Sequence, residues 1–217
     1  MPNFRAVIFD SDGTLSDSSK GILASANAAF AEMGFPLLDM QTIRPWVGPP
    51  LQDSMVNRHG MTPEEAERAI AIYRREYSAG NCFLQRSYDG MVETLERLRA
   101  AGLKTAVASS KPTIFLEKIL KGTNRWHLFD AVCGVDLNRL ESSKTDLIAA
   151  AAAQLGLAPA DCLMVGDRRF DIEGANALHM QSAGALYGYG TREELEQAGA
   201  TYLIEHPSEL LQIAGLD

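Results

Sequence analysis

The stretch AVIFDSDGTL, residues 6–15, decides the fold and points to the chemistry. Its apolar half is typical of a short buried strand, and two carboxylates, Asp10 and Asp12, follow directly. Residues i and i+2 of an extended chain project to the same side, so we expect both carboxylates to emerge together at the carboxyl end of the strand. Ligands bind at that edge of an open α/β sheet. Two carboxylates this close repel each other unless a cation or a shared proton lies between them. The pattern therefore favours a magnesium-dependent phosphoryl-transfer site over a plain Asp-Gly turn.

The composition argues against several classes of partner. The 217 residues carry a formal net charge of −8, from 28 acidic and 20 basic side chains, and no run of Lys or Arg forms a basic stripe. We therefore expect no nucleic-acid partner. No apolar run reaches the roughly 18 residues that cross a bilayer, and no signal peptide is visible. We expect a cytoplasmic protein with no membrane partner. The cysteines, Cys82, Cys133 and Cys162, lack zinc-ligand spacing, and the last two are typical of small core residues.

The hydrophobic pattern divides the chain into two kinds of segment. From Asp17 to about Tyr88 it predicts helices and no clear strand. Afterwards strands and helices alternate, which predicts a parallel sheet covered on both faces. We therefore expect an α/β fold with a Rossmann-like three-layer core and parallel sheet, residues 1–16 and 87–217, plus an inserted all-helical cap domain, residues 17–86. The expected helices are 22–33, 51–58, 63–78, 91–100, 112–121, 143–155, 171–178, 191–198 and 208–213. The expected strands after the first are 103–108, 131–135, 162–165, 181–186 and 201–204, and a Pro-rich loop covers 44–50.

Polar residues follow several of the predicted strands. Ser109 and Ser110 follow the strand 103–108, and Asp167 and Asp171 follow the strand 162–165, while Lys144 stands before an Ala-rich helix. Each has a plainer interpretation: the serines as a helix N-cap, the lysine as a solvated surface residue, the acids as a turn and a cap. Because the carboxyl ends of parallel strands share one edge of the sheet, the whole set is expected to converge on one crevice.

This constellation resembles the haloacid dehalogenase superfamily of phosphohydrolases, on the motif DSDGTLSDS, residues 10–18, and along the whole chain. Two further stretches, VGPPL at 47–51 and YGYGT at 187–191, are similar to the phosphoglycolate-phosphatase-like and 5′-nucleotidase-like group. The resemblance implies a phosphatase that requires Mg²⁺ and acts on a small phosphorylated metabolite. Phosphoglycolate, a nucleoside monophosphate and a sugar phosphate all remain open as substrates, and so do a monomer and a homodimer.

The resemblance also assigns catalytic and metal-binding roles. Asp10 would be the nucleophile that forms an aspartyl-phosphate. Asp12 would be the general acid for the leaving oxygen and then the base for the attacking water. Mg²⁺ would be held by carboxylates of Asp10 and Asp167 and by the backbone carbonyl of Asp12. Asp171 would act from the outer shell by orienting a metal-bound water.

The phosphoryl group would be held by a second set of residues. These are the hydroxyl of Ser109, backbone amides near Gly13 and Ser110, and the ammonium of Lys144, which would also neutralise the nucleophile. Lys144 lies in Ser-Lys-Thr where the group commonly has Lys-Pro, but no nearby lysine is expected to replace it.

The cap is expected to close over the site, with hinges near 16–17 and 87–88. Within it, Arg44 and Trp46 are candidates for reading the leaving group. The favoured alternative is that Arg44 is solvated and that Trp46 fills the core of the cap.

Three other functions compete with a phosphatase. A phosphomutase on the same scaffold would return the phosphoryl group to a sugar. A dehalogenase would have no use for Asp12 as a leaving-group acid and is largely rejected. A non-enzymatic binding protein would be expected to have lost Asp10 or Asp167, and both are present.

Overall fold

The fold is seen in a computed structural model that describes residues 4–48, 51–137 and 142–216. The chain divides into two compact units: Met1–Ser16 with Ser87–Asp217, here called the core unit, and Asp17–Arg86, here called the helical unit.

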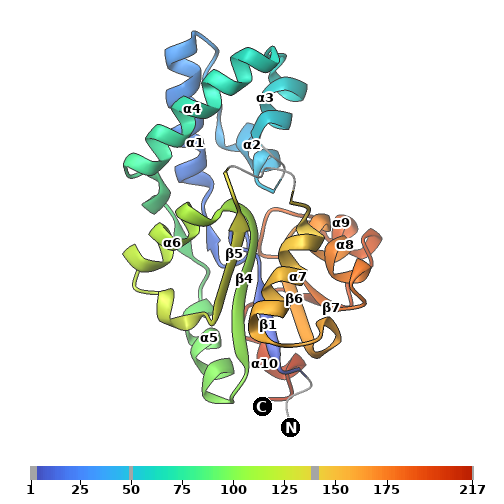
Figure 1. The fold of residues 1–217 in the computed structure, drawn as a ribbon. Coiled ribbons are helices and arrows are strands. Elements are labelled where there is room, and N and C mark those ends of the chain that lie inside the picture. The colour runs from blue at the N-terminus through green and yellow to red at the C-terminus, as the bar shows by residue number, and fades with distance from the viewer. Residues whose placement is uncertain (1–3, 49–50, 138–141, 217) are drawn as a thin grey trace. The chain divides into compact units, whose positions relative to one another are not determined.

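The core unit is built on a six-stranded sheet in the order β5-β4-β1-β6-β7-β8 (Figure 1). All of its paired strands are parallel. The strands are β1 (Ala6–Phe9), β4 (Lys104–Pro112), β5 (Ala131–Val135), β6 (Cys162–Gly166), β7 (Gln181–Ala185) and β8 (Tyr202–Ile204). The chain builds outward from β1 to one side, then returns and builds outward from β6 to the other. The strand order therefore reverses between β1 and β6. At such a switch point the connections leave β1 and β6 on opposite sides and open a crevice at the carboxyl ends of the strands, where α/β proteins bind ligands.

The sheet is covered on both faces because alternate residues of its strands face opposite sides. Val7 and Phe9 of β1 belong to one buried cluster, and Ala6 and Ile8 belong to the other. Side chains of α5 (Met91–Ala100), α6 (Thr113–Gly122) and α10 (Glu209–Ile213) complete the first cluster. Side chains of α7 (Lys144–Leu155) and α8 (Arg169–Ala177) complete the second. With α9 (Arg192–Gln197), these helices form the outer layers, and the predicted three-layer parallel fold is confirmed.

The helical unit contains α1 (Ser19–Met33), α2 (Met40–Ile43), α3 (Leu51–His59) and α4 (Pro63–Ala79). Local sequence signals set the ends of these helices. Thr62 and Glu65 form a reciprocal capping box at the start of α4, and α1 ends at Gly34, whose φ of 77° a glycine adopts without strain. Short 3₁₀ turns are found in the two units at Arg44–Trp46, Asn81–Phe83, Trp126–Leu128 and Pro159–Asp161.

Three local predictions were wrong. The strands β2 (Ser16–Asp17) and β3 (Arg86–Ser87) pair with each other where no strand was expected. They are too short to show a period, and their pairing joins residues about seventy positions apart. The predicted strand 103–108 continues to Pro112, into residues expected to begin a helix. Part of the predicted Pro-rich loop forms a 3₁₀ turn at Arg44–Trp46, while Pro49 and Pro50 lie outside the described residues.

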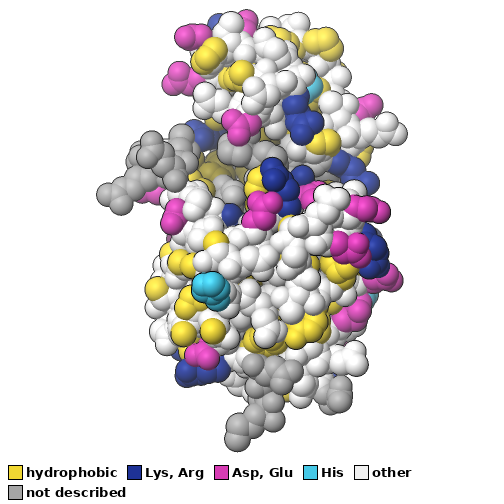
Figure 2. Space-filling view, turned by 90° about the vertical axis from the view of Figure 1, so that its right-hand side faces the viewer, with side chains coloured by type: hydrophobic (Ala, Val, Ile, Leu, Met, Phe, Trp, Pro, Cys, Tyr) yellow, Lys and Arg dark blue, Asp and Glu magenta, His cyan; other side chains and the backbone are white. Residues whose placement is uncertain are grey.

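The described helices include none that is long and apolar enough to cross a membrane. On the face drawn in Figure 2, basic side chains lie singly or in small groups among acidic ones, without a continuous basic stripe.

Candidate active site

The sheet register places the first carboxylates at the carboxyl edge. Phe9 pairs with Val107 of β4 and with Val165 of β6, so Asp10 stands level with the end of β6 and with the point where the pairing of β4 with β1 ends. The Asp10 backbone N–H donates to the Val165 carbonyl at 2.9 Å, and the residue is 7% exposed. Asp10 is thus held at the middle of the sheet and largely shielded from water.

The turn after Asp10 requires glycine at position 13. Gly13 has a φ of +83°, and a Cβ built there would collide with the carboxylate of Asp167. Its N–H donates to the Ser16 carbonyl at 2.9 Å, which closes the turn. The motif glycine therefore lets the loop after β1 approach the loop after β6.

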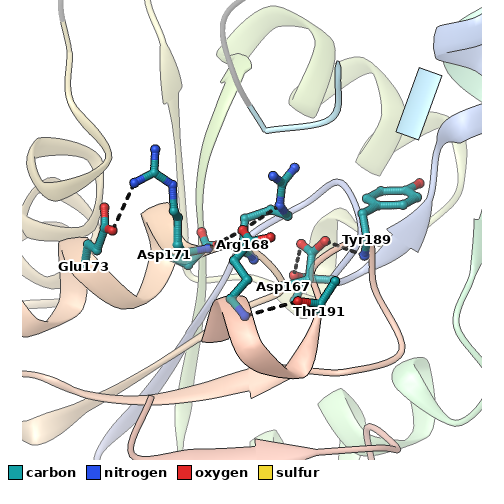
Figure 3. Close-up of polar contacts among 9 residues, drawn as sticks. Asp167, Arg168, Asp171, Glu173, Tyr189 and Thr191 are labelled. Carbon is teal, nitrogen blue, oxygen red and sulfur yellow. Dashed lines mark hydrogen bonds and ion pairs between the residues drawn. The ribbon is translucent and has the colours of Figure 1, made fainter. Parts of the chain in front are cut away.

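Asp167 lies in that second loop and is fully buried. One carboxylate oxygen accepts a hydrogen bond from Thr14 Oγ1 at 3.0 Å, and the other accepts from the Tyr189 N–H at 2.9 Å (Figure 3). Burial, followed by the negative charges of Asp171 and Asp10, raises the pKa of Asp167 well above its usual range. Neither Thr14 nor Tyr189 was assigned a role from the sequence, although both lie within the two motifs that carry the resemblance.

Asp171 is positioned by the first turn of α8. Its Oδ2 accepts from the Arg168 N–H at 3.1 Å, and the Asp171 N–H donates to the Arg168 backbone carbonyl at 3.1 Å (Figure 3). The carboxylates of Asp10, Asp167 and Asp171 each bring an oxygen within 4.8 Å of the others, and all three residues are buried. Three buried acids at this spacing repel one another and form an all-oxygen donor set of the kind that Mg²⁺ prefers. These residues fit a divalent cation.

Lys144, the first residue of α7, lies on the same cluster. Its Nζ is 2.7 Å from Asp10 Oδ1 and 2.6 Å from Asp171 Oδ1, with only 9% of the lysine side chain exposed. Burial lowers the pKa of Lys144, but the charges of Asp10 and Asp171 outweigh burial and raise that pKa above its usual value. The ammonium therefore stays charged and offsets part of the acidic field around Asp10.

The serines after β4 differ from each other. Ser109 is 2% exposed, and its Oγ accepts from the Lys111 N–H at 3.3 Å. Ser110 is exposed. The structure thus places the Ser109 hydroxyl inside the protein beyond the end of the β4–β1 pairing, and leaves the side chain of Ser110 outside.

Lys111 is a site residue that sequence reasoning missed. Its Nζ lies 2.6 Å from Asp12 Oδ1, and the two side chains are 6% and 15% exposed. A signal was present: if the strand is extended past Ala108, Ser109 and Lys111 project to the same side, as Asp10 and Asp12 do. Ending the predicted strand at residue 108 hid this relation.

The two cap candidates lie in the helical unit. Trp46 is 2% exposed, and its ring centroid is 5.8 Å from that of Phe30 and 5.2 Å from that of His59. This packing matches the alternative in which Trp46 fills the core of that unit. Arg44 is exposed, and its part in reading a leaving group stays a prediction.

The chain is similar to known proteins along most of its length. Residues 7–185 match the family model described as haloacid dehalogenase-like hydrolase. The chain is 32% identical to a 5′-nucleotidase of Pseudomonas aeruginosa, with 95% of this chain and 94% of that protein covered. It is 30% identical to a phosphoglycolate phosphatase of Colwellia psychrerythraea, with 95% of each covered. It is also 35% identical to the tyrosine-protein kinase PtkA of Mycobacterium tuberculosis, with 91% of this chain and 67% of that protein covered.

A solved structure shows the same architecture. The crystal structure of a predicted phosphatase from Clostridium acetobutylicum matches with a TM-score of 0.90 and 36% identity, covering 96% of this chain and 97% of that one. The phosphatase names among these relatives bear out the expectation of a phosphoric monoester hydrolase. The chain belongs to the haloacid dehalogenase-like hydrolase family, as its sequence predicted.

Proposed function

We propose that this protein is a Mg²⁺-dependent phosphatase that hydrolyses a small phosphomonoester through an aspartyl-phosphate on Asp10. One observation carries the proposal. The Asp10 carboxylate is buried at the carboxyl edge of β1, with the Lys144 ammonium 2.7 Å away and oxygens of Asp167 and Asp171 within 4.8 Å. A carboxylate is a weak nucleophile towards a dianionic phosphate unless positive charge offsets the repulsion. Lys144 supplies part of that charge, and a divalent cation on the three carboxylates would supply the rest.

In the first step a carboxylate oxygen of Asp10 forms a bond to phosphorus as the ester P–O bond breaks. The leaving oxygen takes the proton from Asp12, which releases the alcohol. In the second step a water oxygen attacks phosphorus and gives its proton to Asp12. The acyl-phosphate P–O bond breaks, and Asp10 is regenerated with release of inorganic phosphate.

The metal would be held by the carboxylates of Asp10 and Asp167 and by the carbonyl of Asp12. Asp171 is proposed to orient its water. When bound, Mg²⁺ neutralises charge on the transferring group. Lys144 holds the oxygens of Asp10 and Asp171 in place, and the buried Ser109 hydroxyl is suited to donate to a phosphoryl oxygen. The names of the relatives, phosphoglycolate phosphatase and 5′-nucleotidase, support a small phosphorylated metabolite as substrate.

The test is phosphate release from a panel of phosphomonoesters that includes phosphoglycolate, nucleoside monophosphates and sugar phosphates, with Mg²⁺ or EDTA. We expect Mg²⁺-dependent release by the natural protein and its loss in Asp10→Asn. Absence of release from every member would refute the proposal. Phosphate exchange between positions of a sugar, without free phosphate, would establish the phosphomutase instead.

A further inference from the structure

The reaction proposed above has a use for Lys144 and none for Lys111, although both lysines are buried and ion-paired in the core unit. Their partners differ. Lys144 contacts Asp10 and Asp171, the nucleophile and a member of the metal cluster. Lys111 Nζ lies 2.6 Å from Asp12 Oδ1, and Asp12 is the proposed general acid for the leaving group. In the proposed reaction, Lys144 therefore lies beside the nucleophile and Lys111 beside the general acid.

The backbone explains why Lys111 points inward. β4 runs on to Pro112, beyond the point where its pairing with β1 ends at Val107. The Lys111 N–H donates to Ser109 Oγ, which fixes the strand end. With 6% of its side chain exposed, Lys111 occupies one place within the site and is not a mobile surface cation.

We infer that Lys111 determines substrate specificity by favouring phosphomonoesters whose leaving group carries a negative charge, such as a carboxylate, close to the ester oxygen. The inference rests on the proposed phosphatase function and names the substrate class of that site. An ester oxygen that is hydrogen-bonded to Asp12 Oδ1 lies within roughly 5 Å of the Lys111 ammonium, because Oδ1 itself is 2.6 Å from Nζ. An ammonium carries three donors, so the same group is able to hold Asp12 and a substrate carboxylate together. Attraction at that range is strong where water is largely excluded.

The test uses two substrates of similar size, one with this charge and one without it: phosphoglycolate and 2-hydroxyethyl phosphate, in which a neutral CH₂OH group replaces the carboxylate. We expect kcat/KM of the natural protein to favour phosphoglycolate by about 10-fold or more, the usual size of a charge-assisted contact. Lys111→Met should lower that ratio about 10-fold or more. Lys111→Arg, which keeps the charge, should hold the ratio within about 3-fold of the natural value.

Lys121→Met is the matched control, because Lys121 lies on α6 with 56% of its side chain exposed and pairs with Glu117. The ratio should not change in this variant. Equal hydrolysis of both substrates by the natural protein would overturn the inference. So would a fall of the same size for both substrates in Lys111→Met, because Lys111 would then act only on Asp12. Hydrolysis of nucleoside monophosphates alone would overturn the inference and leave the phosphatase function standing, whereas no hydrolysis of any ester would refute that function itself.

Discussion

Replacing Lys144 by methionine should destabilise the metal-free core unit by an amount that depends on pH. The change removes the cation that lies 2.7 Å from Asp10 and 2.6 Å from Asp171 while keeping a side chain of similar length. What remains is a group of three buried carboxylates, Asp10, Asp167 and Asp171, whose oxygens lie within 4.8 Å of one another. Repulsion among them is then relieved only by proton uptake, local opening or a bound cation.

The expected size follows from this burial. Removing one partner of a buried ion pair leaves an uncompensated charge and costs about 3–5 kcal/mol of unfolding free energy. For a chain of this length each kcal/mol lowers the melting temperature by about 2–4 °C, so we expect a fall of roughly 6–20 °C in EDTA. A divalent cation binding only the folded protein returns about 2.7 kcal/mol at a hundred times its Kd. Mg²⁺ should therefore restore much of the stability of the variant.

The sign of the pH dependence follows from the two raised carboxylate pKa values. Burial is the main cause of the rise for both, and it places the pKa of Asp171 at about 6 and that of Asp167 well above its usual range. The folded protein thus binds more protons than the unfolded chain from about pH 4 up to the folded pKa of Asp171, about 6, and above it for Asp167. The stability of the folded protein therefore falls as pH rises through these folded pKa values. Without the positive charge of Lys144, this loss of stability with rising pH becomes larger. The difference in unfolding free energy between the variant and the natural protein should be larger at pH 7.5 than at pH 5.

Urea unfolding followed by circular dichroism at both pH values, in EDTA and in Mg²⁺, measures these quantities. Lys121→Met is the control, since its exposed ion pair should contribute less than about 1 kcal/mol. A Lys144→Met protein that unfolds at the same urea concentration as the natural protein in EDTA at pH 7.5 would refute the argument. So would a variant that gains no more from Mg²⁺ than the natural protein does.

Three further changes test other parts of the site. Asp10→Asn should lower kcat by about 10⁴-fold or more while circular dichroism stays unchanged; ordinary turnover would contradict its role as nucleophile. Asp167→Asn should raise the Mg²⁺ concentration for half-maximal activity by at least about 10-fold, and an unaltered metal titration would exclude Asp167 as a ligand. Gly13→Ala should cost about 1–3 kcal/mol more than Gly34→Ala in urea unfolding, because both have positive φ but only the Cβ at position 13 meets a buried carboxylate. Equal losses would show that the loop yields to the added methyl group.

Most of the local structure could be predicted from the sequence. The helix 91–100 and the strand 131–135 are observed as predicted, and α4 starts at the predicted Thr62-Pro63. Such elements are recognisable because apolar periodicity and capping residues act over a few positions. The end of β4 was misjudged for the same reason: Ser109-Ser110 followed by Pro112 is a good local signal for a helix start, and the strand pairing that overrides it comes from β5.

The candidate site also combines features that are visible in the local sequence with features that depend on long-range contacts. The sequence determined by itself that Asp10 and Asp12 follow a buried strand, that Asp167 follows another, and that a glycine closes the turn between the first strand and the next segment. Which groups touch was decided only by the tertiary structure. Lys144 meets Asp10 across 134 positions, and Lys111 meets Asp12 across 99. Strand order and register set those distances. Both arise from the packing of the whole core, so they cannot be predicted from any local pattern of residues.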